Sequence, residues 1–322
     1  MMQIAAPPIA PAQAQDSAPW PSLPLQAWSE TYATLHRWIQ IVGKVRLAQS
    51  SWLNHSWHVA LYVTATGLTT SAIAHDKRSF EIDFDFIAHA LTLRCSDGGR
   101  GGFALQAESV AAFYARLMQE MARLGLQVRI DAKPNEVADA IRLDQDQTHH
   151  AYDAGYANRF WRVLVQADRV FKLFRARFAG KSSPVHFFWG APDLAVTRFS
   201  GRRAPVHPGG IVNLPDRVTR EAYSHELSSC GFWPGGGPIP YPAFYAYAYP
   251  EPAGFSLAPV QPEATFYSPE LHEFILPYHV IRQSATPDAT LLDFLQSSYE
   301  AAARLARWDR QALETSAVGC GV

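Results

Sequence analysis

The segment Phe80-Glu-Ile-Asp-Phe-Asp-Phe alternates strictly between hydrophobic and acidic residues. In a β-strand, successive side chains point to opposite faces, so this segment would have one hydrophobic and one acidic face. The pattern predicts a half-buried strand over residues 80–86, with its aromatic and aliphatic side chains in a core and its carboxylates toward solvent. Such a strand is typical of an antiparallel sheet that is covered on one side.

Around this segment, the sequence predicts a run of strands with an amphipathic helix at each end. Hydrophobic residues recur at helical spacing over 30–50 and 107–124, and strands are predicted from His58, over 80–86 and over 91–94. The second half repeats this order, with helices over 156–178 and 289–307 and strands over 186–189, 194–199, 223–233, 244–249 and 273–276.

This order predicts an α+β fold of two α-β-β-β-β-α-like units related by internal duplication, with mainly antiparallel sheet and helices packed on one face. The expected boundaries are a disordered Ala/Pro-rich tail over 1–22, a first unit over 23–130, a polar connector over 131–154, a second unit over 155–311 and a frayed tail over 312–322.

The composition excludes several classes of protein. The chain has 322 residues, with 28 basic and 29 acidic side chains and a formal charge of −1. A near-neutral chain has no global field that attracts phosphate groups, which argues against a nucleic-acid or membrane-surface partner. No stretch is apolar enough for a membrane-spanning helix. The three cysteines are far apart and odd in number, which favours a cytoplasmic location.

The segment 181–203 contains the highest density of residues suited to chemistry. His186 is the candidate acid or base, and Asp193 in the following turn is the candidate to orient it. Trp189 would form an apolar wall, and Arg198 or Arg202 would hold a carboxylate or phosphate through two hydrogen bonds. The alternative is structural: a core histidine beside a hairpin stabilised by an Asp193–Arg198 ion pair.

A second group of candidates lies on the hairpin over 223–249. His225 is a further catalytic candidate, whereas its neighbour Glu226 would point to the opposite face of the strand. Trp233 precedes a glycine-rich turn and would form part of a ligand wall. Tyr245 and Tyr247 share a face and suit a ring-bearing ligand or another protein chain, although packing of the sheet on a helix explains them equally well.

His58 is the remaining candidate, because it occupies the place in the first unit that His186 occupies in the second. Two related histidines facing one cleft would bind a ligand from both units. With His225 they form the one set of three histidines that we considered as zinc ligands, but satisfied structural histidines are favoured and no metal is predicted. No motif identifies a cofactor.

Several segments resemble a family of bacterial conserved hypothetical proteins known as a domain of unknown function. They include Thr34-Leu-His-Arg-Trp, His58-Val-Ala-Leu-Tyr-Val, Phe160-Trp-Arg-Val-Leu and Tyr223-Ser-His-Glu, together with Gly231-Phe-Trp-Pro-Gly-Gly, Phe244-Tyr-Ala-Tyr-Ala-Tyr-Pro-Glu-Pro, the strand over 80–86 and the run from Ser183 to Arg203. The resemblance covers roughly residues 23–311. It implies no activity, cofactor or catalytic residue.

Two hypotheses follow from these patterns. The first is a catalytic or binding site for an anionic or ring-bearing small molecule in a cleft between the two units. The second is a non-catalytic protein-interaction or homodimerising module that uses the tyrosine-rich strand and the Gly/Pro loops over 201–216 and 234–242. Convergence of His186, Asp193 and Arg198 on one pocket would favour the first hypothesis.

Overall fold

A computed structural model describes residues 18–138 and 140–315 of the chain, which form two antiparallel sheets of six strands each. The first sheet contains β1 (Tyr62–Val63), β2 (Gly67–Thr69), β3 (Ile73–His75), β4 (Arg78–Asp85), β5 (Ala90–Cys95) and β6 (Arg100–Ala104). The second contains β7 (His186–Phe188), β8 (Asp193–Arg203), β9 (His225–Trp233), β10 (Ala243–Tyr249), β11 (Phe266–Ser268) and β12 (Glu273–Pro277).

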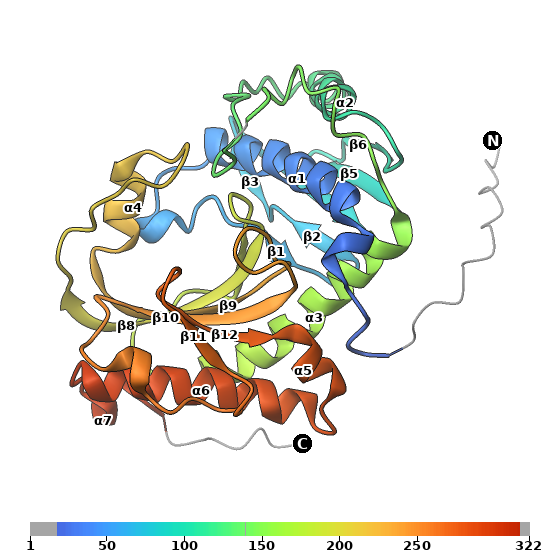
Figure 1. Cartoon of the computed structure of the whole chain (residues 1–322). Helices are drawn as coiled ribbons and strands as arrows, with labels where there is room; N and C mark the ends of the chain where they lie inside the picture. Colours follow the sequence, from blue (N-terminus) through green and yellow to red (C-terminus); the bar gives the residue numbers. More distant parts are fainter. Residues whose placement is uncertain (1–17, 139, 316–322) are drawn as a thin grey trace.

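Seven α-helices accompany these sheets within the described residues. They are α1 (Ser29–Gln49), α2 (Val110–Arg123), α3 (Ala154–Ala176), α4 (Asp216–Ala222), α5 (Tyr278–Gln283), α6 (Pro287–Leu305) and α7 (Arg310–Leu313). In Figure 1, α1 and α2 lie with the first sheet, α6 runs along the second sheet, and α4 lies beside the segment that precedes β1. None of these helices is long and apolar enough to cross a membrane.

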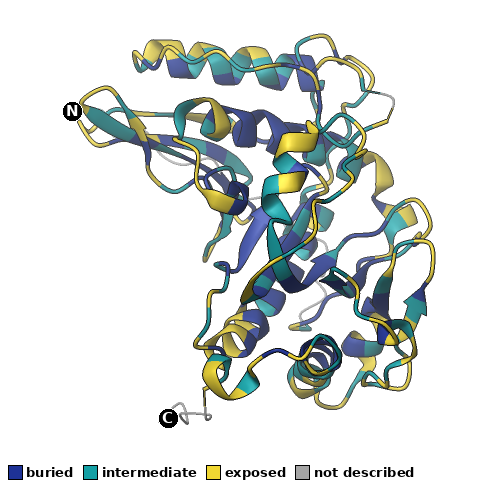
Figure 2. Ribbon diagram, turned by 90° about the vertical axis from the view of Figure 1, so that its left-hand side faces the viewer, coloured by how far each residue is buried: buried dark blue, intermediate teal, exposed yellow. Residues whose placement is uncertain are grey.

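The hydrophobic face of β4 forms the core of the first sheet, as its alternation predicts. Phe80, Ile82 and Phe84 are at most 1% exposed. The ring of Phe84 stacks on Phe113 of α2. Phe113 also stacks on Trp38 of α1, with 4.8 Å between ring centroids. One face of this sheet is therefore covered by α1 and α2. Figure 2 shows the buried residues gathered in the strands and on the inward faces of the helices.

The second sheet is covered on one face by α3 and α6. Phe171 of α3 packs edge-on against Phe244 of β10, and Phe174 packs in the same way against Tyr299 of α6. Because side chains alternate along a strand, the residues on either side of Phe244 point to the opposite face of this sheet. That opposite face carries no helix from α3 or α6 and is turned toward the first half of the chain.

The two sheets meet where the chain enters β1. Leu61 and Phe187 exchange two backbone hydrogen bonds of 2.8 Å each, so the edge strand β7 is joined to the residue that precedes β1. Both side chains are fully buried. This bridge fixes the segment over 52–61 against the uncovered face of the second sheet.

The predicted fold class is confirmed, since the chain is α+β, its sheets are antiparallel and helices cover one face of each. Each sheet has six strands rather than four, because short strands escape detection by periodicity. The first sheet follows chain order apart from β3, whereas the second has the order β11-β12-β10-β9-β8-β7 and contains α4 between β8 and β9. The internal duplication therefore remains a prediction. His58, expected to open a strand, lies in the loop before β1.

The predicted boundary segments make specific contacts. Of the tail predicted over 1–22, residues 1–17 lie outside the described residues, but Trp20 is 4% exposed and packs against Phe244 and Tyr278. Of the tail predicted over 312–322, residues 316–322 are likewise outside, whereas Leu313 accepts a hydrogen bond of 2.7 Å from the backbone of Ala179. Contacts with the rest of the fold are thus made by residues within both predicted tails.

Candidate functional site

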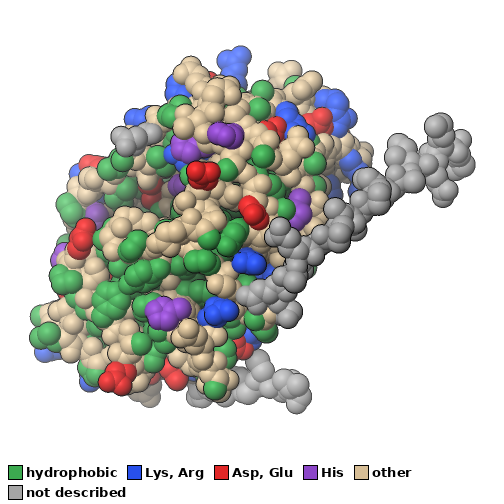
Figure 3. Space-filling view, turned by 45° about the vertical axis from the view of Figure 1, so that its right-hand side comes forward, with side chains coloured by type: hydrophobic (Ala, Val, Ile, Leu, Met, Phe, Trp, Pro, Cys, Tyr) green, Lys and Arg blue, Asp and Glu red, His purple; other side chains and the backbone are tan. Residues whose placement is uncertain are grey.

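A cavity of about 460 Å³ lies between the uncovered face of the second sheet and segments of the first half. This volume is typical of small-molecule sites, which usually measure about 300–1,000 Å³. Its walls come from the end of α1, the segment over 52–59, the connector over 131–136, strands β7 to β10, and the loop and helix over 211–223. On the face shown in Figure 3, basic and acidic side chains lie interspersed around an area of hydrophobic ones.

Strand alternation decides which residues of the second sheet reach the cavity. On β8, Asp193, Thr197 and Phe199 line it, whereas Val196 and Arg198 point toward α3 and α6. Asp193 pairs with Phe188 in the ladder between β8 and β7. Opposed residues of an antiparallel ladder share a face, which places the carboxyl group beside an aromatic wall.

Helix α4 and the loop before it close one side of the cavity. Asn135 of the connector donates from Nδ2 to the carbonyl oxygen of Asn213 at 2.8 Å, and Asn213 donates from Nδ2 to that of Val137 at 2.6 Å. These reciprocal bonds fasten the loop to the connector. Asn213 has a φ of 52°, a left-handed conformation that asparagine tolerates better than most residues.

Asn135 also fixes the connector against α1. Gln40 accepts from the backbone N–H of Asn135 at 2.9 Å and donates to its carbonyl oxygen at 2.8 Å. Lys44 donates from Nζ to Asn135 Oδ1 at 2.5 Å. These contacts explain why polar residues lie on the buried side of α1, and they place the next residue, Glu136, at the cavity wall.

Glu136 lies in an unusual position for a glutamate. Its φ of 56° is in the left-handed region, as are those of His55 and Ser56, which also line the cavity. A Cβ atom built on Gly190 would lie 1.9 Å from Glu136 Oε1, so the carboxyl group rests directly on that glycine. Non-glycine residues with positive φ tend to gather at functional sites, where the surrounding structure holds them.

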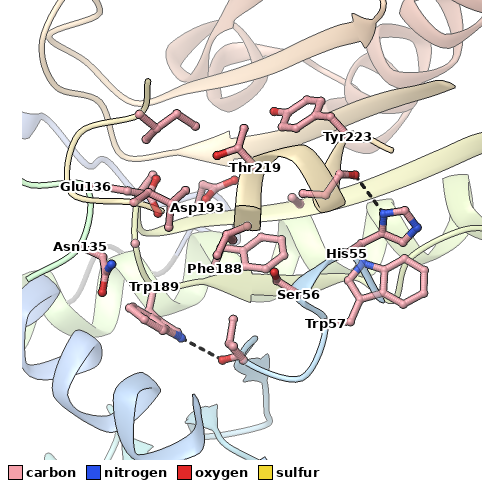
Figure 4. A pocket seen from close by; sticks show the side chains of 18 of the residues that line it. His55, Ser56, Trp57, Asn135, Glu136, Phe188, Trp189, Asp193, Thr219 and Tyr223 are labelled. Atoms are coloured by element: carbon pink, nitrogen blue, oxygen red, sulfur yellow. Dashed lines mark hydrogen bonds between the residues drawn. The ribbon is translucent and has the colours of Figure 1, made fainter. Parts of the chain in front are cut away.

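Asp193 and Glu136 form a carboxyl pair at one end of the cavity, as Figure 4 shows. Desolvation raises the pKa of Asp193 to about 7, with a further rise caused by Glu136 and an opposing effect of the hydrogen bond that Tyr245 donates to Asp193. Desolvation alone raises the pKa of Glu136 to about 7. Both groups therefore exchange protons near neutral pH. Nearby, Glu273 has a pKa raised to about 8 by desolvation and by Asp193.

Three buried polar atoms of the cavity wall lack a hydrogen-bond partner among residues 18–138 and 140–315. They are Ser56 Oγ, His186 Nδ1 and Thr219 Oγ1, in side chains that are 7%, 1% and 2% exposed. An unpaired buried polar group costs about 1–3 kcal/mol. These three atoms belong to three separate segments around one cavity.

His186 is a neutral imidazole at physiological pH, because burial lowers its pKa to about 3. Its ring packs edge-on against Phe188 at 4.4 Å between centroids. It can accept or donate one hydrogen bond, but it binds a proton too weakly to act as a general base at neutral pH. The proton-exchanging groups of the cavity are the carboxyls of Asp193 and Glu136.

Six of the ten candidate residues from the sequence line this one cavity: His58, His186, Trp189, Asp193, Tyr245 and Tyr247. The indole of Trp189 donates from Nε1 to the carbonyl oxygen of Val59 at 2.9 Å and lies over Gly43 of α1, where a Cβ atom would be 2.3 Å from the ring. The hydroxyl groups of Tyr247 and Tyr223 are hydrogen-bonded at 2.9 Å. These contacts hold the aromatic walls in place.

The structure places Arg198 and Arg202 outside the cavity. Arg198 is fully buried on the other face of β8, where its guanidinium lies 3.4 Å from the ring centroid of Phe174 and donates to the carbonyl oxygen of Phe174. Arg202 pairs with Glu226 at 2.6 Å near the surface. Neither Arg198 nor Arg202 therefore holds an anionic group in the cavity, contrary to the expectation from the sequence. The Asp193–Arg198 ion pair of the structural alternative is also absent, because residues 193 and 198 point to opposite faces of the same strand.

His225 and Trp233 do not themselves line the cavity. A register shift between Phe199 and Arg203 interrupts the ladder before Arg203 pairs with His225, and Trp233 packs in a small cluster with Ile239. The ring centroid of His225 lies 5.9 Å from that of His55, which does line the cavity. Among the described residues, no group of three or more His, Cys, Asp or Glu side chains could hold a metal ion.

Several residues of the site escaped the sequence analysis. Glu136 lies in the predicted connector, and Thr219 lies on α4, a seven-residue helix between two strands. Ser56 and Trp57 lie directly before the candidate His58. No local periodicity marks these positions, because each reaches the cavity through long-range folding.

The fold and site define an α+β protein with an aromatic-walled cavity and a half-buried carboxyl pair between two antiparallel sheets. The chain belongs to a family of unknown function, DUF5996, which it matches over residues 20–315. The resemblance noted in the sequence is thereby confirmed. No curated protein and no solved structure matches the chain.

Proposed function

We propose that this protein binds a ring-bearing small molecule in the cavity between its two sheets. The observation that carries the proposal is the set of three unpartnered polar atoms, on Ser56, His186 and Thr219, around a space of about 460 Å³. Aromatic side chains on both sides, including Trp57 and Trp189, supply flat apolar surfaces for a ring. A few polar groups between apolar walls are typical of ligand sites.

The ligand class is narrower than the sequence indicates. With Arg198 and Arg202 outside the cavity, the expected grip on an anionic group is missing, and the carboxyls of Asp193 and Glu136 would repel one. The tyrosines that suited a protein-facing surface instead line the cavity. These placements support a small-molecule site over the interaction module.

Proton transfer is a second candidate function of the same site. Asp193 and Glu136 have pKa values of about 7, close to the value at which a carboxyl group both donates and accepts protons efficiently under neutral conditions. Tyr245 orients Asp193 through its hydroxyl group. A bound substrate would meet an acid and a base on one side of the cavity, while His186 contributes a neutral hydrogen bond.

Ligand-observed NMR with a set of small aromatic alcohols, amides and amines tests the binding proposal. Ala191, an exposed turn residue that lines the cavity, offers a blocking variant, Ala191→Trp. Ala88, an exposed alanine in the turn between β4 and β5, offers the matched control, Ala88→Trp. We expect saturation transfer that Ala191→Trp removes and Ala88→Trp preserves. Equal binding by both variants would place the ligands elsewhere and contradict the proposal.

A further inference from the structure

The carboxyl groups at one end of the cavity have no basic partner. Asp193 accepts a hydrogen bond from Tyr245, and no lysine, arginine or histidine within the described residues forms an ion pair with Asp193, Glu136 or Glu273. Buried carboxylates without a counter-ion are costly, and most proteins pair them. When they are ionised, these carboxyl groups are therefore left without a counter-charge.

The two cations that line the cavity are engaged elsewhere. Lys44 donates to Asn135 and interacts electrostatically with Asp131, and Arg217 lies over the ring of Trp52 at 6.0 Å. Neither forms an ion pair with Glu136 or Asp193. The carboxyl groups at this end of the cavity therefore have no ion-pair partner among the described residues of its walls.

Other observations point independently to a ligand at this place. Ser56, His186 and Thr219, each with one unpartnered polar atom, line the same cavity, and their side chains are more than nine-tenths buried. Trp189 is adjacent to the glycine on which Glu136 rests, and its ring already has the ammonium of Lys44 5.6 Å from its centroid. An aromatic face next to carboxylates is the arrangement that proteins use to bind organic cations.

We infer that the cavity recognises a cationic ligand, an ammonium group carried on or beside a ring, with Glu136 and Asp193 as its counter-charges and Trp189 as its aromatic face. The inference rests on the proposed function and names its ligand class. An inorganic cation fits less well, because fewer than three His, Cys, Asp or Glu ligands converge at any place in the described chain. The cavity volume also exceeds what a metal ion needs.

Three matched probes separate charge from ring binding: benzylammonium, benzyl alcohol and benzoate. Each has one phenyl ring and one polar group, so their affinities at pH 8 report the sign of charge that the cavity prefers. We expect benzylammonium to bind about tenfold or more tightly than benzyl alcohol, and benzoate to bind most weakly. In Glu136→Gln the ratio of the affinities for benzylammonium and benzyl alcohol should fall several-fold.

Glu270→Gln is the matched control, since it removes the same charge from an exposed position outside the cavity. It should leave all three affinities unchanged. If benzyl alcohol binds as tightly as benzylammonium and Ala191→Trp abolishes both, the cavity binds rings but the charge inference is wrong. If none of the probes binds, or if Ala191→Trp binds them all equally well, both the inference and the proposed function are contradicted.

Discussion

Replacing Glu136 by glutamine should stabilise the protein in a pH-dependent way. The carboxyl group has no ion-pair or hydrogen-bond partner within residues 18–138 and 140–315, and desolvation raises its pKa from 4.5 to about 7. Because the folded state holds the proton more tightly than the unfolded state, the associated stability is fully present below pH 4.5 and is lost as the pH rises through 7. The wild-type protein should therefore become less stable between pH 5 and pH 8.

The pKa shift sets the size of this effect. A rise of about 2.5 pKa units corresponds to at most about 3.4 kcal/mol of lost stability above pH 7. Water in the cavity reduces the penalty, so we expect Glu136→Gln to raise the free energy of unfolding by about 1–3 kcal/mol at pH 8. At pH 5, where folded Glu136 is protonated and resembles glutamine, the difference should be below about 1 kcal/mol.

Urea unfolding followed by tryptophan fluorescence at pH 5 and pH 8 measures both values. Glu270→Gln again serves as the control for net charge and should change neither value by more than about 0.5 kcal/mol. A Glu136→Gln protein that is less stable than the wild type at pH 8 would show that Glu136 has a favourable cationic partner. That result would refute the reasoning about an unpaired buried carboxylate.

Three further substitutions test the surrounding structure. Arg198→Met should leave probe binding unchanged, since the side chain lies on the other face of β8; a loss of affinity without unfolding would contradict this placement. Gly43→Ala should lower the free energy of unfolding by about 1–3 kcal/mol and weaken binding of aromatic probes, because the new methyl group collides with the ring of Trp189. An unchanged melting temperature and an unchanged affinity would show that the ring can move aside. Asn213→Ala should lower the free energy of unfolding by about 1–2 kcal/mol and speed proteolysis within residues 204–215, because the loop loses its side-chain bond to Val137 of the connector. Equal cleavage rates in the variant and the wild type would mean that this bond does not hold the loop.

The sequence predicts the fold class because its strongest signals are local. The alternation over 80–86 and the helical spacing over 156–178 report burial on one face, and the structure has β4 and α3 at these places. The number of strands is harder to predict, since β1, β2 and β3 have two or three residues each and show no period. Sheet order in the second half depends on long-range pairing that no local pattern encodes.

The candidate site is predictable in part, and strand parity explains the division for the candidates on β7, β8 and β10. His186, Asp193 and the two tyrosines reach the cavity because each has the parity of the uncovered face. The same rule excludes Arg198, since an unbroken strand turns residues five apart to opposite faces. Glu136 could not have been found in this way, because it reaches Asp193 only through the bonds of Asn135 to α1 and to the loop before α4.

A crystal structure of the protein grown with the tightest-binding of the three benzyl probes tests the central claim most directly. We expect the phenyl ring between the aromatic walls beside Trp57 and Trp189. The polar group should lie within hydrogen-bonding distance of Glu136, Asp193 or one of the unpartnered atoms of Ser56, His186 and Thr219. A probe found on another surface, with the cavity free of it at saturating concentration, would contradict the account.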